Sequence, residues 1–223
     1  MDVWITGDTH GYYDELMARL ARNGVQPGDK IIICGDFGFQ FDTPDHRVSL
    51  LKLKKEPYEF WFVDGNHENY SALNSCEVID WNKGKAHKVS DNIIHMMRGQ
   101  CYEICGKKFF TFGGAYSIDK AFRKEGFSWF PQELPSAEEY ELADKTLAEH
   151  SYKVNYIITH TAPFSIIQAL NRPVYDDELQ LNGFLEKLRN IVSYDHWHFG
   201  HFHMDKSILG KYTVMFNDMI KLI

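Results

Sequence analysis

The feature that most constrains the fold is a unit of apolar strand, short polar loop and helix that occurs three times near the start of the chain. Three predicted strand and helix pairs follow this order: Val3–Thr6 with Tyr12–Asn23, Lys30–Cys34 with Pro44–Lys55, and Glu59–Val63 with a short helix after Asn69. Such units place their strands in parallel, because each helix carries the chain back to the start of the next strand. The sequence therefore predicts an α/β fold.

The middle of the chain has a different pattern. It contains three β-rich runs between His87 and Ala115, with a turn around Gly106-Lys107 before the last of them: Ile93–Met97, Cys101–Cys105 and Lys108–Phe112. Short strands joined by turns are typical of antiparallel hairpins. These runs therefore predict a second sheet.

The last part of the chain alternates helices and strands again. A capping box at Ser136-Ala137-Glu138-Glu139 predicts a helix to about His150. The remaining predicted elements are strand Val154–Thr159, a helix over Asp177–Val192, and strands Asp195–Phe199, Ser207–Leu209 and Tyr212–Asn217. The whole pattern indicates two sheets with helices outside them, and no linker divides the 223 residues.

Charge and composition argue against several classes of protein. The formal net charge of −7 is opposite to that of a protein that holds long nucleic acid on a broad basic face. No apolar run is long enough to cross a bilayer, and the first residues resemble no leader. The cysteines lack the paired close spacing of a four-cysteine zinc site. We therefore expect a cytoplasmic chain with reduced thiols and no membrane partner.

Five short polar segments stand at the predicted ends of strands. They are Gly7-Asp8-Thr9-His10-Gly11, Gly35-Asp36, Gly65-Asn66-His67-Glu68, Thr159-His160-Thr161 and Gly200-His201-Phe202-His203. Ligands gather at the carboxyl ends of the strands of α/β sheets, so these loops can converge although they are far apart in the sequence. Carboxylate, imidazole and amide groups together suit divalent metals such as Mn²⁺, Fe²⁺, Zn²⁺ or Ni²⁺.

In this order, the five segments resemble the signature of the calcineurin-like metallophosphoesterases, and in particular a single-domain bacterial or phage-type member. The resemblance implies one domain over residues 1–223, folded as a four-layer α/β/β/α sandwich of two packed mixed sheets, with the metal site at the carboxyl ends of the strands. It also implies two divalent metal ions, with Mn²⁺ favoured and Fe, Zn, Ni or Mg as alternatives.

Carried over by residue, the resemblance assigns a role to each polar side chain of the segments. One metal would be held by Asp8, His10 and His203, the other by Asn66, His160 and His201, and Asp36 would bridge them. Such a pair of ions can polarise phosphorus and turn a shared water into the attacking hydroxide. His67 would be the catalytic histidine that stabilises or protonates the departing oxygen.

One segment departs from the protein serine/threonine phosphatases of the same superfamily. Those enzymes carry an Asp-Arg-Gly element after the second segment, where this chain has Phe37-Gly38-Phe39-Gln40. The arginine that would bind phosphate there is missing. We therefore expect a hydrolase of phosphomonoesters or phosphodiesters whose substrate is a small phosphoester or a nucleotide.

The long connection from Ala115 to Pro135 is a candidate wall of the substrate site, since it is rich in aromatic and basic residues. Arg98 or Arg123 could bind phosphate, and Tyr116 could stack on a base. The plainer interpretation is that the loop covers the second sheet. The histidines outside the five segments are expected to be surface or packing residues: His46, His87, His95, His150, His196 and His198.

Two other functions remain open from the sequence. A non-catalytic binding or scaffold protein could share the fold, although the presence of His67 and all the predicted ligands argues against it. A nuclease could use the same metals, although the acidic charge and the lack of a recognisable nucleic-acid module argue against that.

Overall fold

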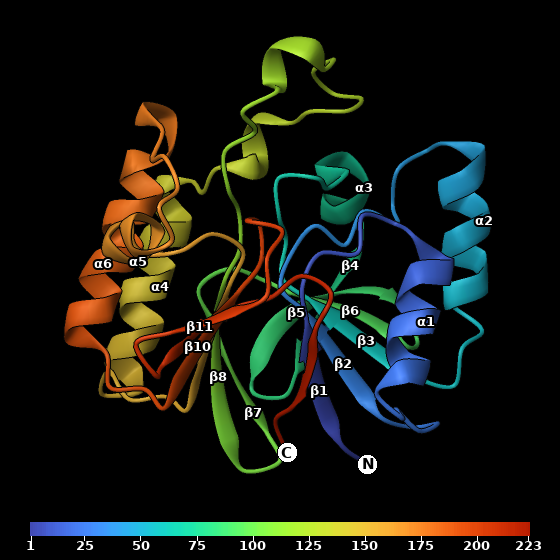
Figure 1. The fold of residues 1–223 in the computed structure, drawn as a ribbon, viewed down its shortest axis with the longest axis horizontal. Helices are drawn as coiled ribbons and strands as arrows, with labels where there is room; N and C mark the ends of the chain where they lie inside the picture. Colours follow the sequence, from blue (N-terminus) through green and yellow to red (C-terminus); the bar gives the residue numbers. More distant parts are fainter.

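The computed structural model describes all residues from 1 to 223, and its core is a pair of β-sheets (Figure 1). The seven-stranded sheet has the order β13 (Met219–Lys221), β1 (Val3–Thr6), β2 (Lys30–Ile33), β3 (Glu59–Phe62), β6 (Ile93–Met96), β5 (Gly84–Ser90) and β4 (Glu77–Trp81). The six-stranded sheet has the order β11 (Lys206–Ile208), β12 (Tyr212–Val214), β10 (His196–Phe199), β9 (Tyr156–Thr159), β8 (Lys107–Phe112) and β7 (Gln100–Ile104). Both sheets are mixed, as predicted.

Helices cover the outer face of each sheet. One side carries α1 (Tyr13–Arg22), α2 (Pro44–Leu53) and the short α3 (Tyr70–Asn74), and the other carries α4 (Ala137–Glu149), α5 (Phe164–Ala169) and α6 (Leu179–Ile191) (Figure 1). Three short 3-10 helices occur in loops: η1 (Lys120–Phe122), η2 (Pro131–Glu133) and η3 (Asp176–Glu178). No helix is both long enough and apolar enough to cross a membrane.

The isoleucines of β2 show why the layers stack in this way. Successive side chains of a strand point to opposite faces of its sheet. Ile31 and Ile33 pack in one cluster with Leu16 of α1 and Leu53 of α2, whereas Ile32 packs in another with residues of the second sheet. A strand that is apolar on both faces is buried between two layers. The four-layer sandwich predicted for the chain is confirmed.

One strand lies in a different sheet from the one predicted. Ile93–Met96 was expected in the second sheet, but β6 pairs in parallel with β3, with Phe60 opposite Ile93. Asn92 supports this placement, because its side chain donates hydrogen bonds to the carbonyl oxygens of Leu53 at the end of α2 (3.1 Å) and of Tyr58 just before β3 (3.2 Å), and its own carbonyl accepts from the Phe60 N–H at 2.8 Å. The hairpin of β4 and β5 extends the same sheet and was not predicted.

The two ends of the chain meet in the first sheet. The strand predicted over Tyr212–Asn217 ends at Val214, and β13 then pairs antiparallel with β1, with Thr6 opposite Met219. The capping box is confirmed, since the Glu139 N–H donates to Ser136 Oγ and the Ser136 N–H donates to the Glu139 carboxylate. The helix predicted over Asp177–Val192 begins instead with η3 and continues as α6.

Candidate metal centre

Five loops that follow parallel strands meet at one edge of the molecule. β1, β2 and β3 are parallel in the first sheet, and β9 and β10 are parallel in the second, so their carboxyl ends point the same way within each sheet. The structure brings together there all eight polar residues predicted for the site: Asp8, His10, Asp36, Asn66, His67, His160, His201 and His203.

Several of these residues have an uncommon backbone conformation. The φ angles of His10, Asp36, His201 and His203 are 48°, 48°, 69° and 48°. This left-handed region costs a non-glycine residue about 1–3 kcal/mol, and such residues tend to cluster at functional sites. The strain indicates that the loops are held in place to aim their side chains.

Two glycines allow the loops to approach one another closely. A Cβ atom on Gly35, whose φ is +90°, would lie 2.2 Å from His160 Nδ1, and one on Gly65 would lie 2.1 Å from Asp36 Oδ1. Neither distance is possible for real atoms. A side chain at either position would therefore push Asp36 and His160 apart.

Asp36, Asn66 and His160 form the buried half of the centre. His160 Nε2 lies 3.2 Å from Asp36 Oδ1 and 3.2 Å from Asn66 Oδ1. Asn66 Nδ2 donates to Ser117 Oγ at 3.2 Å, so the amide oxygen is the atom that faces the centre. The His201 ring lies beside His160, with the two ring centroids 5.0 Å apart.

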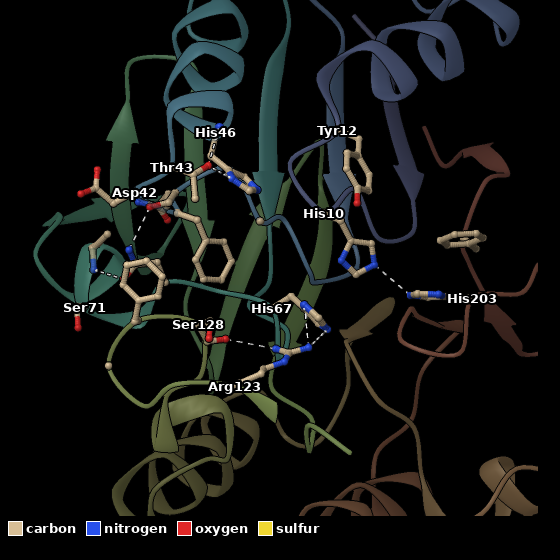
Figure 2. A pocket seen from close by; sticks show the side chains of 18 residues that line it. His10, Tyr12, Asp42, Thr43, His46, His67, Ser71, Arg123, Ser128 and His203 are labelled. Carbon is tan, nitrogen blue, oxygen red and sulfur yellow. Dashed lines mark hydrogen bonds between the residues drawn. The ribbon is translucent and has the colours of Figure 1, made fainter. Parts of the chain in front are cut away.

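Asp8, His10 and His203 form the more open half. His203 Nε2 lies 3.0 Å from His10 Nε2 and 3.1 Å from Asp8 Oδ2. Figure 2 shows the two rings facing each other across the mouth of the site. Asp8 Oδ2 is buried, yet no donor meets it with hydrogen-bond geometry. A buried carboxylate oxygen without a donor is costly unless a cation satisfies it.

The charges of the buried half favour a cation. Burial opposes ionisation of Asp36, but the charge of His160 and its hydrogen bond outweigh it and hold the pKa of Asp36 well below its ordinary value. In the same contact, Asp36 raises the pKa of His160 to about 10 against the effect of burial, so without a metal this imidazole is protonated, and a bound ion would replace that proton. Burial lowers the pKa of His201 to about 3, so that ring is neutral, as a metal ligand must be. The donor set therefore fits divalent ions.

An arginine that sequence reasoning missed holds the loop after β1. Arg19 of α1 is buried and donates to Thr6 Oγ1 (2.7 Å) and to the carbonyl oxygens of Gly7 and Asp8 (3.3 Å each). Its position on the same helix face as Leu16 and Leu20 was the signal available, because an arginine on an apolar face must find buried acceptors.

Glu68 supports the loop after β2. Its carboxylate accepts hydrogen bonds from the backbone N–H groups of Phe37 (2.6 Å) and Gly38 (3.2 Å). The sequence placed Glu68 outside the ligand set, and its contacts agree with that position. Phe37 and Gly38 are therefore fixed beside Asp36 by an acid from the third segment.

His67 lies beside the predicted ligands, and Arg123 is in contact with it. The His67 N–H donates to Asp36 Oδ1 at 2.7 Å, and Arg123 Nη2 lies 2.6 Å from His67 Nε2 (Figure 2). The same Nη2 atom lies 3.1 Å from His67 Nδ1, so the guanidinium faces the edge of the imidazole ring. Burial lowers the pKa of His67, and the charge of Arg123 adds to that effect.

Arg98 does not join the centre. It is buried, with Nε 2.8 Å from Asp64 Oδ2 and Nη1 3.0 Å from Glu139 Oε2. Its guanidinium also donates to Tyr70 Oη at 2.9 Å. With these donors committed to protein acceptors, Arg98 is not free to bind phosphate, and the structure does not support the substrate role predicted for it.

Two cavities open on the centre. The larger has a volume of about 1070 Å³ and extends from His10 and His203 to His46 at the start of α2 (Figure 2). The smaller has a volume of about 440 Å³ and lies on the side of Asn66 and His201, where Tyr116 also lines it. His46 is thus a cavity residue that sequence reasoning missed.

The long loop predicted over residues 115–135 supplies walls to both cavities. Arg123 and Phe127 line the larger one, and Tyr116 and Ile118 line the smaller one. In Figure 1 the loop is the yellow-green segment that extends above the two sheets. The plainer interpretation, that it only covers the second sheet, does not describe its path.

The sequence pattern of one protein family matches the part of the chain that contains the candidate centre. It is the family described as calcineurin-like phosphoesterase, and it matches residues 1–205, which contain every residue of the candidate centre. The chain belongs to the calcineurin-like phosphoesterase family. Membership supports metal-dependent hydrolysis of phosphoesters as the general chemistry of the centre, without naming a substrate or a metal.

Two relatives from the same superfamily are similar over a shorter stretch. The chain is 34% identical over 82 residues to serine/threonine-protein phosphatase 2 of Salmonella typhimurium (strain LT2), which covers 36% of this chain and 35% of that protein. It is 35% identical over 80 residues to serine/threonine-protein phosphatase 2 of Escherichia coli (strain K12), covering 36% and 35%. The chain thus spans about a third of the length of the relatives it matches.

Proposed function

We propose that the chain is a dinuclear metal-dependent hydrolase of phosphomonoesters or phosphodiesters with a small-molecule or nucleotide substrate. One ion would be held by Asp8, His10 and His203, the other by Asn66, His160 and His201, with Asp36 between them. The observation that carries this proposal is the group of Asp8, His10 and His203, whose possible ligand atoms all lie within 4.8 Å of one another in a chain of this family. Bound there, two divalent ions supply positive charge to the phosphoryl oxygens and acidify the attacking water.

Asp36 and His67 have different roles in the proposed reaction. Asp36 presents one carboxylate to both halves of the centre, because its Oδ1 lies 3.2 Å from His160 and its Oδ2 lies 3.8 Å from His10. His67 is next to this carboxylate, and its ring forms a group with His10 and Asp36 in which the possible ligand atoms all lie within 4.8 Å of one another. We assign it to the departing oxygen and not to a metal. From there it can hydrogen-bond or protonate the ester oxygen that departs.

We assign Arg123 to the positioning of His67. Its Nη2 atom contacts His67 Nε2 at 2.6 Å and Asp119 Oδ2 at 2.9 Å. These contacts keep the imidazole in one orientation. A phosphate-binding role for Arg123, as proposed from the sequence, would require it to leave both partners. Tyr116 keeps its proposed role as a wall of the substrate site.

The absence of an arginine among Phe37-Gly38-Phe39-Gln40 separates this chain from the protein serine/threonine phosphatases. Phe37 and Phe39 are fully buried and pack on each other, with ring centroids 4.7 Å apart, whereas Gly38 and Gln40 line the larger cavity. This segment therefore presents no cation to a phosphate, which supports a small phosphoester as substrate. We therefore do not propose protein serine/threonine phosphatase activity for this chain.

Turnover of p-nitrophenyl phosphate and bis(p-nitrophenyl) phosphate tests the proposal. We expect hydrolysis with Mn²⁺, loss on chelation, and recovery when Mn²⁺ is restored. His203→Ala should lose most of the activity. Because the His203 side chain is 52% exposed, we expect this variant to keep its fold. His150→Ala is the matched control, because His150 follows α4 and lines neither cavity. Equal rates with and without metal would contradict the proposal.

A further inference from the structure

We infer that the substrate of this centre is a phosphodiester, with one organic group in each of the two cavities. This inference rests on the proposed hydrolase function and narrows it. The two cavities share His67 and His203 as lining residues, so they meet at the point where phosphorus would be held. A monoester has one organic group and leaves one cavity empty, whereas a diester fills both.

The lining of each cavity suits an organic group. Large apolar side chains are normally scattered singly on a protein surface. Here Tyr12 (58% exposed) and Phe127 (60%) line the larger cavity, while Ile118 (63%) and Tyr175 (37%) line the smaller one. Exposed aromatic rings on both sides of the centre offer surfaces on which a nucleobase or another planar group can stack.

The charges around phosphorus also favour a diester. A phosphodiester carries one negative charge, whereas a monoester carries close to two near neutral pH. The cation nearest His67 is Arg123, and Asp119 at 2.9 Å already balances its charge. Arg172 is exposed and lines the smaller cavity, where it can meet a polar part of the substituent. The side chains therefore add little positive charge at phosphorus beyond that of the ions.

The reaction balances without a further reagent. Water adds to phosphorus, the bond between phosphorus and one ester oxygen breaks, and one proton of the water ends on that departing oxygen. His67, which lines both cavities, is placed to hydrogen-bond the departing oxygen. The products are a phosphomonoester and an alcohol or phenol, one in each cavity.

A series of substrates with one shared leaving group tests the inference on the unaltered protein. We would measure kcat/KM with Mn²⁺ for p-nitrophenyl phosphate, ethyl p-nitrophenyl phosphate and the p-nitrophenyl ester of thymidine 5′-phosphate. The thymidine diester should exceed the ethyl diester by about 10-fold or more, because base stacking on aromatic rings contributes on that scale. The monoester should be the poorest substrate.

Each other outcome has a separate meaning. No release of p-nitrophenol from any of the three would overturn the proposed hydrolase function itself. A monoester that is turned over faster than both diesters would overturn the diester inference and leave the hydrolase function standing. Equal values for the ethyl and thymidine diesters would show that the second cavity takes no part, and would also overturn the inference.

Two variants then test each cavity separately. Phe127→Ala alters the larger cavity and Tyr175→Ala the smaller, so both should lower kcat/KM for the thymidine diester several-fold. At most one of them should affect the monoester. Phe122→Ala is the matched control, because Phe122 is 93% exposed on the same loop as Phe127 and lines neither cavity. If both variants leave the thymidine diester unchanged, or both lower the monoester equally, the inference is wrong.

Discussion

Two buried acidic clusters lie near the carboxyl ends of neighbouring strands, and they differ in what completes them. Asp64, after β3, accepts from Arg98 Nε at 2.8 Å and from Tyr70 Oη at 2.9 Å, and lies 3.0 Å from His95 Nε2. In the candidate metal centre the partners of Asp8 and Asp36 are imidazoles and backbone N–H groups.

Asp64 has a structural role, whereas Asp8 and Asp36 are proposed to bind cations. Burial opposes ionisation of Asp64, but the charges of Arg98 and His95 hold its pKa well below the ordinary value. The negative charge of Asp64 is therefore matched from within the chain. Asp8 and Asp36 form ion pairs with histidines and with no arginine or lysine, so under the proposed function divalent ions would replace the protons of these histidines.

The largest effect is expected from Asp36→Asn. An amide cannot supply charge to both halves of the centre, so activity should fall by more than the roughly 10–100-fold typical when a ligand loses its hydrogen-bond partner. The measurement is kcat/KM in excess Mn²⁺. Thermal unfolding monitored by circular dichroism provides the control for folding. A variant that keeps its fold and full turnover would remove Asp36 from the bridging role.

Arg98→Met should affect stability instead of metal binding. It leaves Asp64 buried without its cation, which costs about 3–5 kcal/mol in the free energy of unfolding. Urea denaturation measures the loss. The double variant with Asp64→Asn removes both charges and should recover part of that stability. If Arg98→Met is as stable as the unaltered protein but loses its metals, the two clusters are not distinct in the way described.

His67→Ala should lower turnover by about 100-fold or more, the usual scale for general acid catalysis. The bound metal should be retained, because His67 acts on the departing oxygen. The loss should shrink with leaving groups that need no proton, so a p-nitrophenyl ester and an alkyl ester of the same acid are compared. Loss of metal in this variant would make His67 a ligand.

The smallest expected effect concerns His198, a buried histidine that belongs to neither cluster. Both of its ring nitrogens lack partners, and burial lowers its pKa from 6.5 to about 3. His198→Leu should raise the free energy of unfolding by about 1 kcal/mol at neutral pH, since it removes unpaired polar atoms. Urea denaturation at several pH values measures this.

The pH dependence of the free energy of unfolding gives a second test of the role of His198. The unfolded chain binds a proton at His198 below about pH 6.5, while the folded chain does so only near pH 3, so stability is lost as the pH falls through that range. His198→Leu should make this decline shallower. An unchanged slope would mean that His198 contributes nothing to acid unfolding.

The sequence predicted which of the proposed ligands lie close together because two patterns coincide at them. Each predicted ligand follows an apolar strand, and parallel strands bring their carboxyl ends together whatever the details of packing. The same reasoning failed for Arg98, which comes just after β6. With β6 assigned to the second sheet, nothing placed Arg98 beside Asp64 at the end of β3. The pairing of β6 with β3 is accompanied by side-chain contacts of Asn92, and no periodic pattern in the sequence reveals either.

The contact between Arg123 and His67 was beyond sequence reasoning for another reason. It depends on the path of a long connection that contains only short 3-10 helices, η1 and η2. Aromatic and basic residues marked that connection as a candidate wall, but composition does not determine which side chain reaches which atom. The individual contacts in such loops are set by packing that the sequence does not display.

Metal content by elemental analysis tests the central comparison most directly. The protein would be loaded with Mn²⁺ and dialysed, in three forms: unaltered, Asp36→Asn and Arg98→Met. We predict two ions per chain in the unaltered protein and in Arg98→Met, and fewer than one in Asp36→Asn. Two tightly held ions in Asp36→Asn, or none in the unaltered protein, would contradict the account.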